Sequence, residues 1–205
     1  ARGGLLYAPD TYMDKIAVGP GLPAGVIDLD KSPSDNVKAI AKARGVSTQE
    51  VSVCVLERER HEHIVADIRT TGARVMMIPD GDVAGVISTT DAATGIDMYV
   101  GQGGAPEGVL AATALRCVGG QMQARLFFRN DDERARAAKT GITDLDRKYD
   151  LMELASSDCL FVATGVTEGS LVEGVRRKDG TISTETLLMS SAGSIVRRIK
   201  TVRPA

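Results

Sequence analysis

Three short polar segments in this sequence carry the residue types needed to hold a phosphorylated ligand. They are Glu57–Arg60, Asp80–Asp82 and the glycine-rich stretch Gly101–Gly108. Arginine can meet a phosphate through two parallel hydrogen bonds. Aspartate can accept from sugar hydroxyls or hold a metal, and glycine lets a ligand approach the backbone closely. These residue types together predict a site for a phosphate or a sugar phosphate.

The glycine-rich stretch stands between an apolar segment, Ile96–Val100, and a predicted helix that begins at Pro106. Glycines here are expected to adopt positive φ, and proline suits the first helical position. A turn of this kind directs unpaired backbone N–H groups and the positive end of a helix dipole toward one point, which predicts an anion site. Glu107, in the first helical turn, either balances the dipole or holds a metal.

Each segment also has a plain structural interpretation. Glu57–Arg60 can be a solvated charged turn, and Asp80–Asp82 can be a turn whose second aspartate caps a helix. Tyr12 can serve packing alone. His61 is expected to be a hydrogen-bond partner near its turn rather than a base. The combination of the segments at one sheet edge, where ligands bind in open α/β sheets, favours the binding interpretation.

The elements that would position these residues alternate between strands and helices. Nearly continuous apolar runs predict buried, mostly parallel strands, at 51–56, 74–79, 96–100 and 159–163. Helices are predicted at 34–44 with a Ser34 cap, and at 61–71, 83–90 and 106–118. Beyond residue 120 the sequence predicts a strand at 124–128, a charged helix or loop at 130–139, and a meander added to the sheet at 171–176, 181–189 and 194–202. This pattern indicates one α/β domain.

Composition narrows the function classes. The 205 residues carry a formal net charge of −2 with Lys and Arg spread along the chain, which argues against nucleic acid as the main partner. No apolar run is long enough to span a bilayer, so no membrane-spanning segment is predicted and no membrane partner is expected. Cys54, Cys117 and Cys159 lie in apolar runs and are expected to be buried free thiols in a reducing cytoplasm.

Several motifs together resemble class II fructose-1,6-bisphosphatases, and more closely the cyanobacterial type that also acts on sedoheptulose 1,7-bisphosphate. The resemblance covers essentially the whole chain. Its motifs are Pro79–Gly85, Gly101–Val109 and Gly119–Arg125, supported by Ala8–Lys15, Arg58–His61, Ala163–Gly169 and Thr184–Thr186.

This resemblance implies a layered α/β fold with a mixed sheet and flanking helices, of the inositol monophosphatase-like superfamily. It implies metal-dependent hydrolysis of the 1-phosphate of a sugar bisphosphate, in gluconeogenesis or the Calvin cycle, by a cytoplasmic homo-oligomer (dimer or tetramer). It also implies that Glu107 helps to hold Mg²⁺ or Mn²⁺. The implied substrate-binding residues are Tyr12, Arg58, Glu59, Arg60, Asp80, Gly81, Asp82 and Gly104.

One departure from the family pattern limits what these 205 residues are expected to do. The acidic metal motif Asp-Pro-Ile/Leu-Glu-Gly-Thr, found in the N-terminal half of the family, does not occur here. Residues 1–205 are therefore expected to be a single C-terminal, substrate-binding portion that lacks the N-terminal metal-binding part and is inactive alone. No residue in it is predicted to be catalytic. Two alternatives remain: a sugar-phosphate-binding or regulatory module without catalysis, and a phosphatase for another substrate such as an inositol phosphate.

Overall fold

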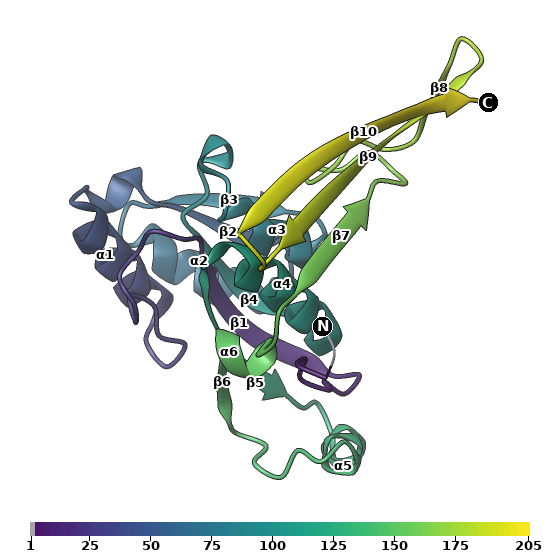
Figure 1. Ribbon diagram of the computed structural model, residues 1–205. Helices are drawn as coiled ribbons and strands as arrows, with labels where there is room; N and C mark the ends of the chain where they lie inside the picture. Colours follow the sequence, from purple (N-terminus) through teal and green to yellow (C-terminus); the bar gives the residue numbers. More distant parts are fainter. Residues whose placement is uncertain (1–2) are drawn as a thin grey trace.

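A six-stranded mixed sheet forms the centre of the computed structural model, which describes residues 3–205 (Figure 1). Its strand order is β3-β2-β4-β1-β5-β6. The strands β2, β3 and β4 run parallel, whereas β1 pairs antiparallel with both β4 and β5. The strands are β1 (Tyr12–Val18), β2 (Ser52–Leu56), β3 (Arg74–Ile78), β4 (Met98–Gly104), β5 (Gln121–Phe127) and β6 (Lys148–Asp150). The predicted mixed α/β sheet is thus confirmed.

Helices cover both faces of this sheet and divide its core in two. On one face α1 and α2 pack on the aliphatic side chains of β1, β2 and β4, and on the other face α3 and α4 pack together. The helices are α1 (Pro33–Arg44), α2 (Glu62–Arg69), α3 (Asp82–Ser88), α4 (Ala105–Val118), α5 (Asp131–Lys139) and α6 (Leu151–Leu154). Short 3-10 turns span Thr48–Glu50, Glu59–His61 and Ala92–Thr94.

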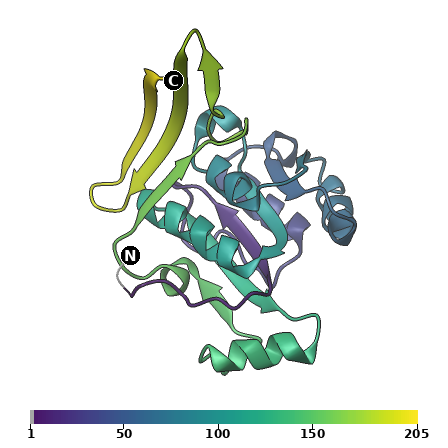
Figure 2. The ribbon, with the colours of Figure 1, turned by 90° about the vertical axis from the view of Figure 1, so that its right-hand side faces the viewer.

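Residues 160–204 form a second, antiparallel sheet instead of a meander added to the first. Its strands are β7 (Leu160–Thr164), β8 (Arg176–Lys178), β9 (Thr181–Ser190) and β10 (Ile195–Pro204). Figure 2 shows α4 between the two sheets, and its contacts with β1, β4, β5, β7 and β9 agree with that placement. The expectation that 159–163 joins a parallel sheet is wrong, and 171–176 is mostly irregular.

Other local expectations need correction. The helix α1 is capped by Ser32, whose hydroxyl accepts from the Asp35 amide at 3.1 Å, and not by Ser34. β3 is largely exposed instead of buried, because it is the edge strand of its sheet. β1, the strand between β4 and β5, was not predicted from the sequence. No helix in residues 3–205 is both long and apolar enough to cross a bilayer.

Candidate active site

The carboxyl ends of β2, β3 and β4 meet the first turn of α4 around a cavity of about 440 Å³. We call it the strand-end cavity. The polar residues that line it come from five separate stretches of sequence: Asp10, Thr11, Tyr12, Arg58, Arg60, Asp80, Asp82, Glu107 and Arg129. The predicted convergence of the three strand ends is therefore confirmed, and Gly103 and Gly104 form part of the wall.

Three arginines face this cavity. The Arg58 Nη1 donates to the Glu57 and Pro79 carbonyls, both at 2.7 Å, which fixes its guanidinium between the ends of β2 and β3. The guanidinium carbons of Arg60 and Arg129 lie 5.1 Å and 4.8 Å from the centroid of the Tyr12 ring. Such cation–π contacts hold both cations while leaving their N–H groups able to donate to an anion. Tyr12 therefore positions arginines besides lining the cavity.

Arg129 was not predicted from the sequence. It follows β5, and its guanidinium forms an ion pair with Glu133 of α5, with Nη2 and Oε1 2.5 Å apart. Hydrogen bonds from Arg129 lower the pKa of the almost fully buried Glu133 carboxyl. Only the fold brings this residue to the cavity, since it lies far in sequence from the three strand ends.

Lys15 is the second residue that sequence reasoning missed. It lies in the middle of β1, its side chain is fully buried, and its Nζ lies 2.5 Å from Asp82 Oδ2 and 3.0 Å from the Gly104 carbonyl. Burial lowers the pKa of Lys15, an effect that Asp82 opposes. The other Asp82 oxygen accepts from the Val83 amide at 2.9 Å, so the carboxylate is held at both oxygens. A lysine directly before the apolar run Ile16–Val18 was the available signal.

The glycines of this region are required mainly for space. A Cβ on Gly104 would lie 1.9 Å from Glu107 Oε2, and one on Gly103 would lie 2.3 Å from Asp82 Oδ2. Among the four glycines expected to adopt positive φ, only Gly101 does so, with φ of 154°. Gly103 and Gly104 belong to β4, which pairs with β1, instead of forming a turn. Their small size lets the carboxylates approach the strand.

The α4 N-terminus offers fewer free amides than the sequence predicts. The Ala105 amide donates to the Thr11 carbonyl at 2.9 Å, and Pro106 has no N–H. Side chains are therefore the main polar groups of the cavity. Gly81, with φ of 86°, caps α3 in place of Asp82, and its amide donates to Asp80 Oδ1 at 2.8 Å. Glu59 is exposed in a 3-10 turn and does not line the cavity.

His61 has the structural role that the sequence suggested. Its buried ring links the Leu56 carbonyl to the Gln102 amide, with distances of 2.8 Å from Nδ1 and 2.9 Å from Nε2. Because Nε2 accepts from the amide, Nδ1 carries the proton. Burial lowers the pKa of His61, so the neutral ring is favoured. This side chain joins the end of β2 to β4 and fixes the wall that carries Gly103 and Gly104.

The described residues do not fit a complete site for a divalent cation. No group of three or more Asp, Glu, His or Cys side chains in residues 3–205 is arranged to hold a metal. Asp82 is already paired with Lys15, and the other carboxylates of the cavity, Asp10, Asp80 and Glu107, do not form a three-ligand group, so Glu107 at the start of α4 provides at most part of a ligand set. Mg²⁺ requires near-octahedral oxygen coordination, so one carboxylate is insufficient.

Comparison with known proteins gives a consistent match over the chain. The family model for bacterial fructose-1,6-bisphosphatase, glpX-encoded, matches residues 1–203. A Synechococcus elongatus protein named D-fructose 1,6-bisphosphatase class 2/sedoheptulose 1,7-bisphosphatase is 40% identical, and the match covers 98% of this chain and 62% of the relative. A Synechocystis protein of the same name is 39% identical with the same coverage. The chain thus spans less than two thirds of the length of these relatives. It belongs to the family of bacterial, glpX-encoded fructose-1,6-bisphosphatases.

Proposed function

We propose that this chain is the substrate-binding, C-terminal portion of a metal-dependent sugar-bisphosphate phosphatase. The complete protein would hydrolyse the 1-phosphate of fructose 1,6-bisphosphate and of sedoheptulose 1,7-bisphosphate, which would place it in gluconeogenesis or the Calvin cycle. The observation that carries this proposal is the convergence of three arginines, three aspartates (Asp10, Asp80 and Asp82) and Glu107 on the strand-end cavity. Family membership supports the reaction, and the fold is proposed to be that of the inositol monophosphatase-like superfamily.

The charges of the cavity suggest how the ligand would lie. Arg58, Arg60 and Arg129 would meet phosphate oxygens, for which guanidinium groups are well suited. Asp80 and Asp82 would accept from sugar hydroxyls, since a second anion beside a phosphate would repel it. The remaining proposed substrate-binding residues, Tyr12, Glu59, Gly81 and Gly104, would act by supporting these groups and their loops. Glu59 would do so from outside the cavity wall.

Glu107 is proposed as this chain's contribution to a Mg²⁺ or Mn²⁺ site. Since the described residues do not complete such a site, the other ligands would come from the part of the family that these residues do not match. The 205-residue chain is therefore expected to bind fructose 1,6-bisphosphate without releasing phosphate from it.

Calorimetric titration of the chain with fructose 1,6-bisphosphate tests the binding step. We expect saturable binding that Arg58→Met weakens by at least about tenfold, the loss expected for one charge-assisted contact. Lys38→Met, on the exposed side of α1, is the matched control and should bind like the wild type. Binding that is equally strong in both variants would refute the assignment of the cavity.

A second candidate function is a binding or regulatory module without catalysis, which the incomplete ligand set favours. The two candidate functions are distinguished by adding the portion of the Synechococcus relative that this chain does not match, together with Mg²⁺ or Mn²⁺, and measuring phosphate release. Phosphate release that Glu107→Gln abolishes supports the phosphatase. Ligand binding with no turnover under these conditions supports the module.

We also propose that the protein is a homo-oligomer located in the cytoplasm. The face of the second sheet that points away from α4 carries exposed aliphatic side chains on β7 and β10, among them Leu160, Val162 and Ile199. Exposed apolar side chains gathered on one face are common at protein interfaces. Sedimentation should give a dimer or tetramer, and Val162→Lys should lower its association constant.

A further inference from the structure

A second cavity of about 370 Å³ opens beside the candidate active site, on the sheet face that carries α1 and α2. We call it the lateral cavity. It lies between strands β4, β1 and β5 and the beginnings of the two helices. Its apolar lining includes Ile16, Leu29, Ile64, Val100 and Phe127, of which Phe127 is 40% exposed. Cavities of this size and mixed lining are typical of small-molecule sites.

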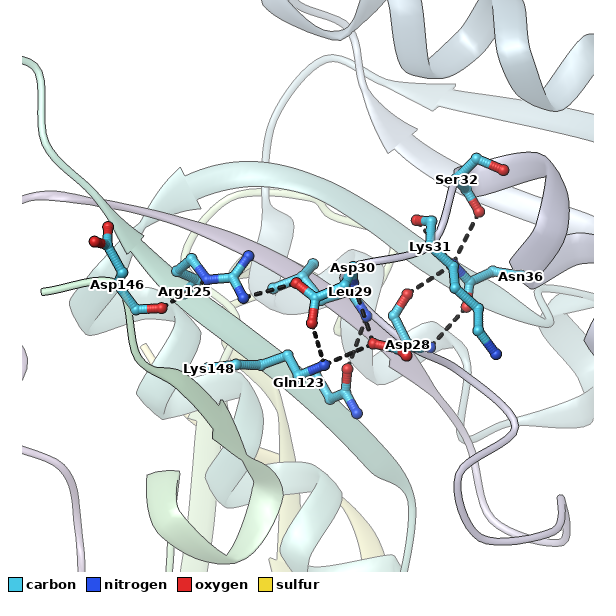
Figure 3. A network of polar contacts seen from close by, with 10 residues as sticks. All are labelled: Asp28, Leu29, Asp30, Lys31, Ser32, Asn36, Gln123, Arg125, Asp146 and Lys148. Atoms are coloured by element: carbon cyan, nitrogen blue, oxygen red, sulfur yellow. Dashed lines mark hydrogen bonds and ion pairs between the residues drawn. The ribbon is translucent and has the colours of Figure 1, made fainter. Parts of the chain in front are cut away.

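A network of ion pairs and hydrogen bonds, shown in Figure 3, includes Leu29, Lys31 and Arg125, which line the lateral cavity. The Lys148 Nζ lies 2.7 Å from Asp28 Oδ1 and 2.5 Å from Asp30 Oδ2, and Arg125 Nη2 lies 2.7 Å from Asp30 Oδ1. The Leu29 amide donates to the Gln123 side chain at 2.7 Å. These contacts tie the loop before α1 to β5 and β6. The cavity is therefore formed without a ligand, which lowers the entropic cost of binding.

The charge around the lateral cavity favours an anion. Lys31 and Arg60 line it and form no ion pair among residues 3–205, and the exposed His63 lies beside them. Lys15 and Arg125 also line it, but they are paired with Asp82 and Asp30. The lining has one carboxylate, Asp14, which accepts a hydrogen bond from the side-chain Nε2 of Gln102 at 2.8 Å.

Arg60 connects the two cavities, because it lines both. Its Nη2 donates to the Gln102 carbonyl at 2.9 Å, and its guanidinium stacks on Tyr12. The same segment of β4 contributes Gly101 and Gln102 to the lateral cavity and Gly103 and Gly104 to the strand-end cavity. An anion in either cavity would attract this one guanidinium.

We propose that the lateral cavity is a second ligand site, for a small organic anion with an apolar or aromatic body, and that its ligand competes with phosphate for Arg60. The apolar lining and Phe127 would hold the body, while Lys31 and Arg60 would hold the charge. Occupancy of one cavity would then weaken anion binding in the other. This site does not depend on the reaction proposed above.

Phenylphosphonate is a suitable probe, since it has an aromatic ring, a dianion and no ester to hydrolyse, and methylphosphonate is its control without the ring. Amide chemical shifts of the ¹⁵N-labelled chain resolve the two cavities. We expect phenylphosphonate to shift Lys31, Gln102 and Phe127 and to bind at least about fivefold more tightly than methylphosphonate, because the ring adds apolar burial. Lys31→Met and Phe127→Ser should each weaken it about fivefold, and Lys38→Met should not.

Saturating inorganic phosphate tests the competition. It should raise the apparent dissociation constant of phenylphosphonate in the wild type, and Arg60→Met should remove that dependence. The proposal is overturned if Lys31→Met and Phe127→Ser leave binding unchanged, or if Arg58→Met abolishes the shifts at Lys31 and Phe127. Failure of fructose 1,6-bisphosphate to bind, with these shifts intact, would refute the proposed function alone.

Discussion

Replacing Lys15 with methionine tests whether the buried ion pair beneath the strand-end cavity holds the site together. The lysine side chain is fully buried and that of Asp82 is 12% exposed. Methionine fills similar space but leaves the carboxylate without its cation, a change that typically costs about 3–5 kcal/mol. Because Asp82 keeps some exposure at the cavity wall, we expect about 3 kcal/mol, and the lost bond to the Gly104 carbonyl adds about 1 kcal/mol.

A loss of about 4 kcal/mol is a large part of the 5–15 kcal/mol typical of a folded domain. Urea unfolding, followed by far-UV circular dichroism, should show the midpoint falling by about 1.5 M at unchanged slope. The double variant Lys15→Met/Asp82→Asn removes both charges, so it should recover about 2 kcal/mol relative to the sum of the single losses.

Two outcomes would refute this reasoning. One is a Lys15→Met loss below about 1 kcal/mol, the level of an exposed pair. The other is additivity of the two single substitutions within about 0.5 kcal/mol, which would mean that the residues do not interact. The exposed pair of Lys38 and Asp35 on α1 offers a matched control, and Lys38→Met should change stability by less than about 0.5 kcal/mol.

Three further predictions concern neighbouring residues. Gly104→Ala should displace the Glu107 carboxylate, because the new methyl group would lie 1.9 Å from its Oε2, and should weaken Mn²⁺ binding to the complete enzyme while urea stability changes little. Arg129→Met should weaken fructose 1,6-bisphosphate binding by about tenfold in calorimetry and lower stability, since the buried Glu133 loses the nearer of its two cations and keeps only Arg136 at 3.8 Å. Folding lowers the pKa of His61, so the unfolded chain binds more protons than the folded chain below about pH 6.5. The free energy of unfolding should therefore fall as the pH drops through that range. His61→Gln should flatten this part of the plot of urea midpoint against pH.

Local sequence patterns predicted the elements that deliver residues to the site. The signals for β2, β3, β4 and the end of α1 are local, because an apolar run or a terminal glycine involves only residues that are neighbours in the sequence. In the structure these elements lie within a few residues of the predicted positions. The sequence also predicted that Arg58, Asp80 and Glu107 lie close together, because parallel strands end at the same edge of a sheet. The cavity confirms that gathering.

Non-local packing produced what the sequence did not reveal. The apolar run of β7 looks like a buried parallel strand, yet its antiparallel pairing with β9 depends on a segment more than twenty residues away. β1 was missed because Asp14 and Lys15 interrupt its apolar pattern. In the fold each has a partner from β4 or α3: Asp14 meets the Gln102 side chain and Lys15 meets Asp82.

The glycine-rich stretch lies at the candidate site as predicted, but the physical reason predicted for its glycines was incomplete. Positive φ was the expected cause of its glycines, but Gly103 and Gly104 are extended β4 residues and Gly108 is helical. A Cβ on Gly103 would lie 3.1 Å from the Lys15 Nζ, and one on Gly108 would lie 2.5 Å from the Met13 sulfur. These glycines therefore make room for two β1 side chains, Met13 and Lys15, of which Lys15 pairs with Asp82. Substituting Gly103 should disturb the same ion pair as substituting Lys15, so the two losses in unfolding free energy should be less than additive.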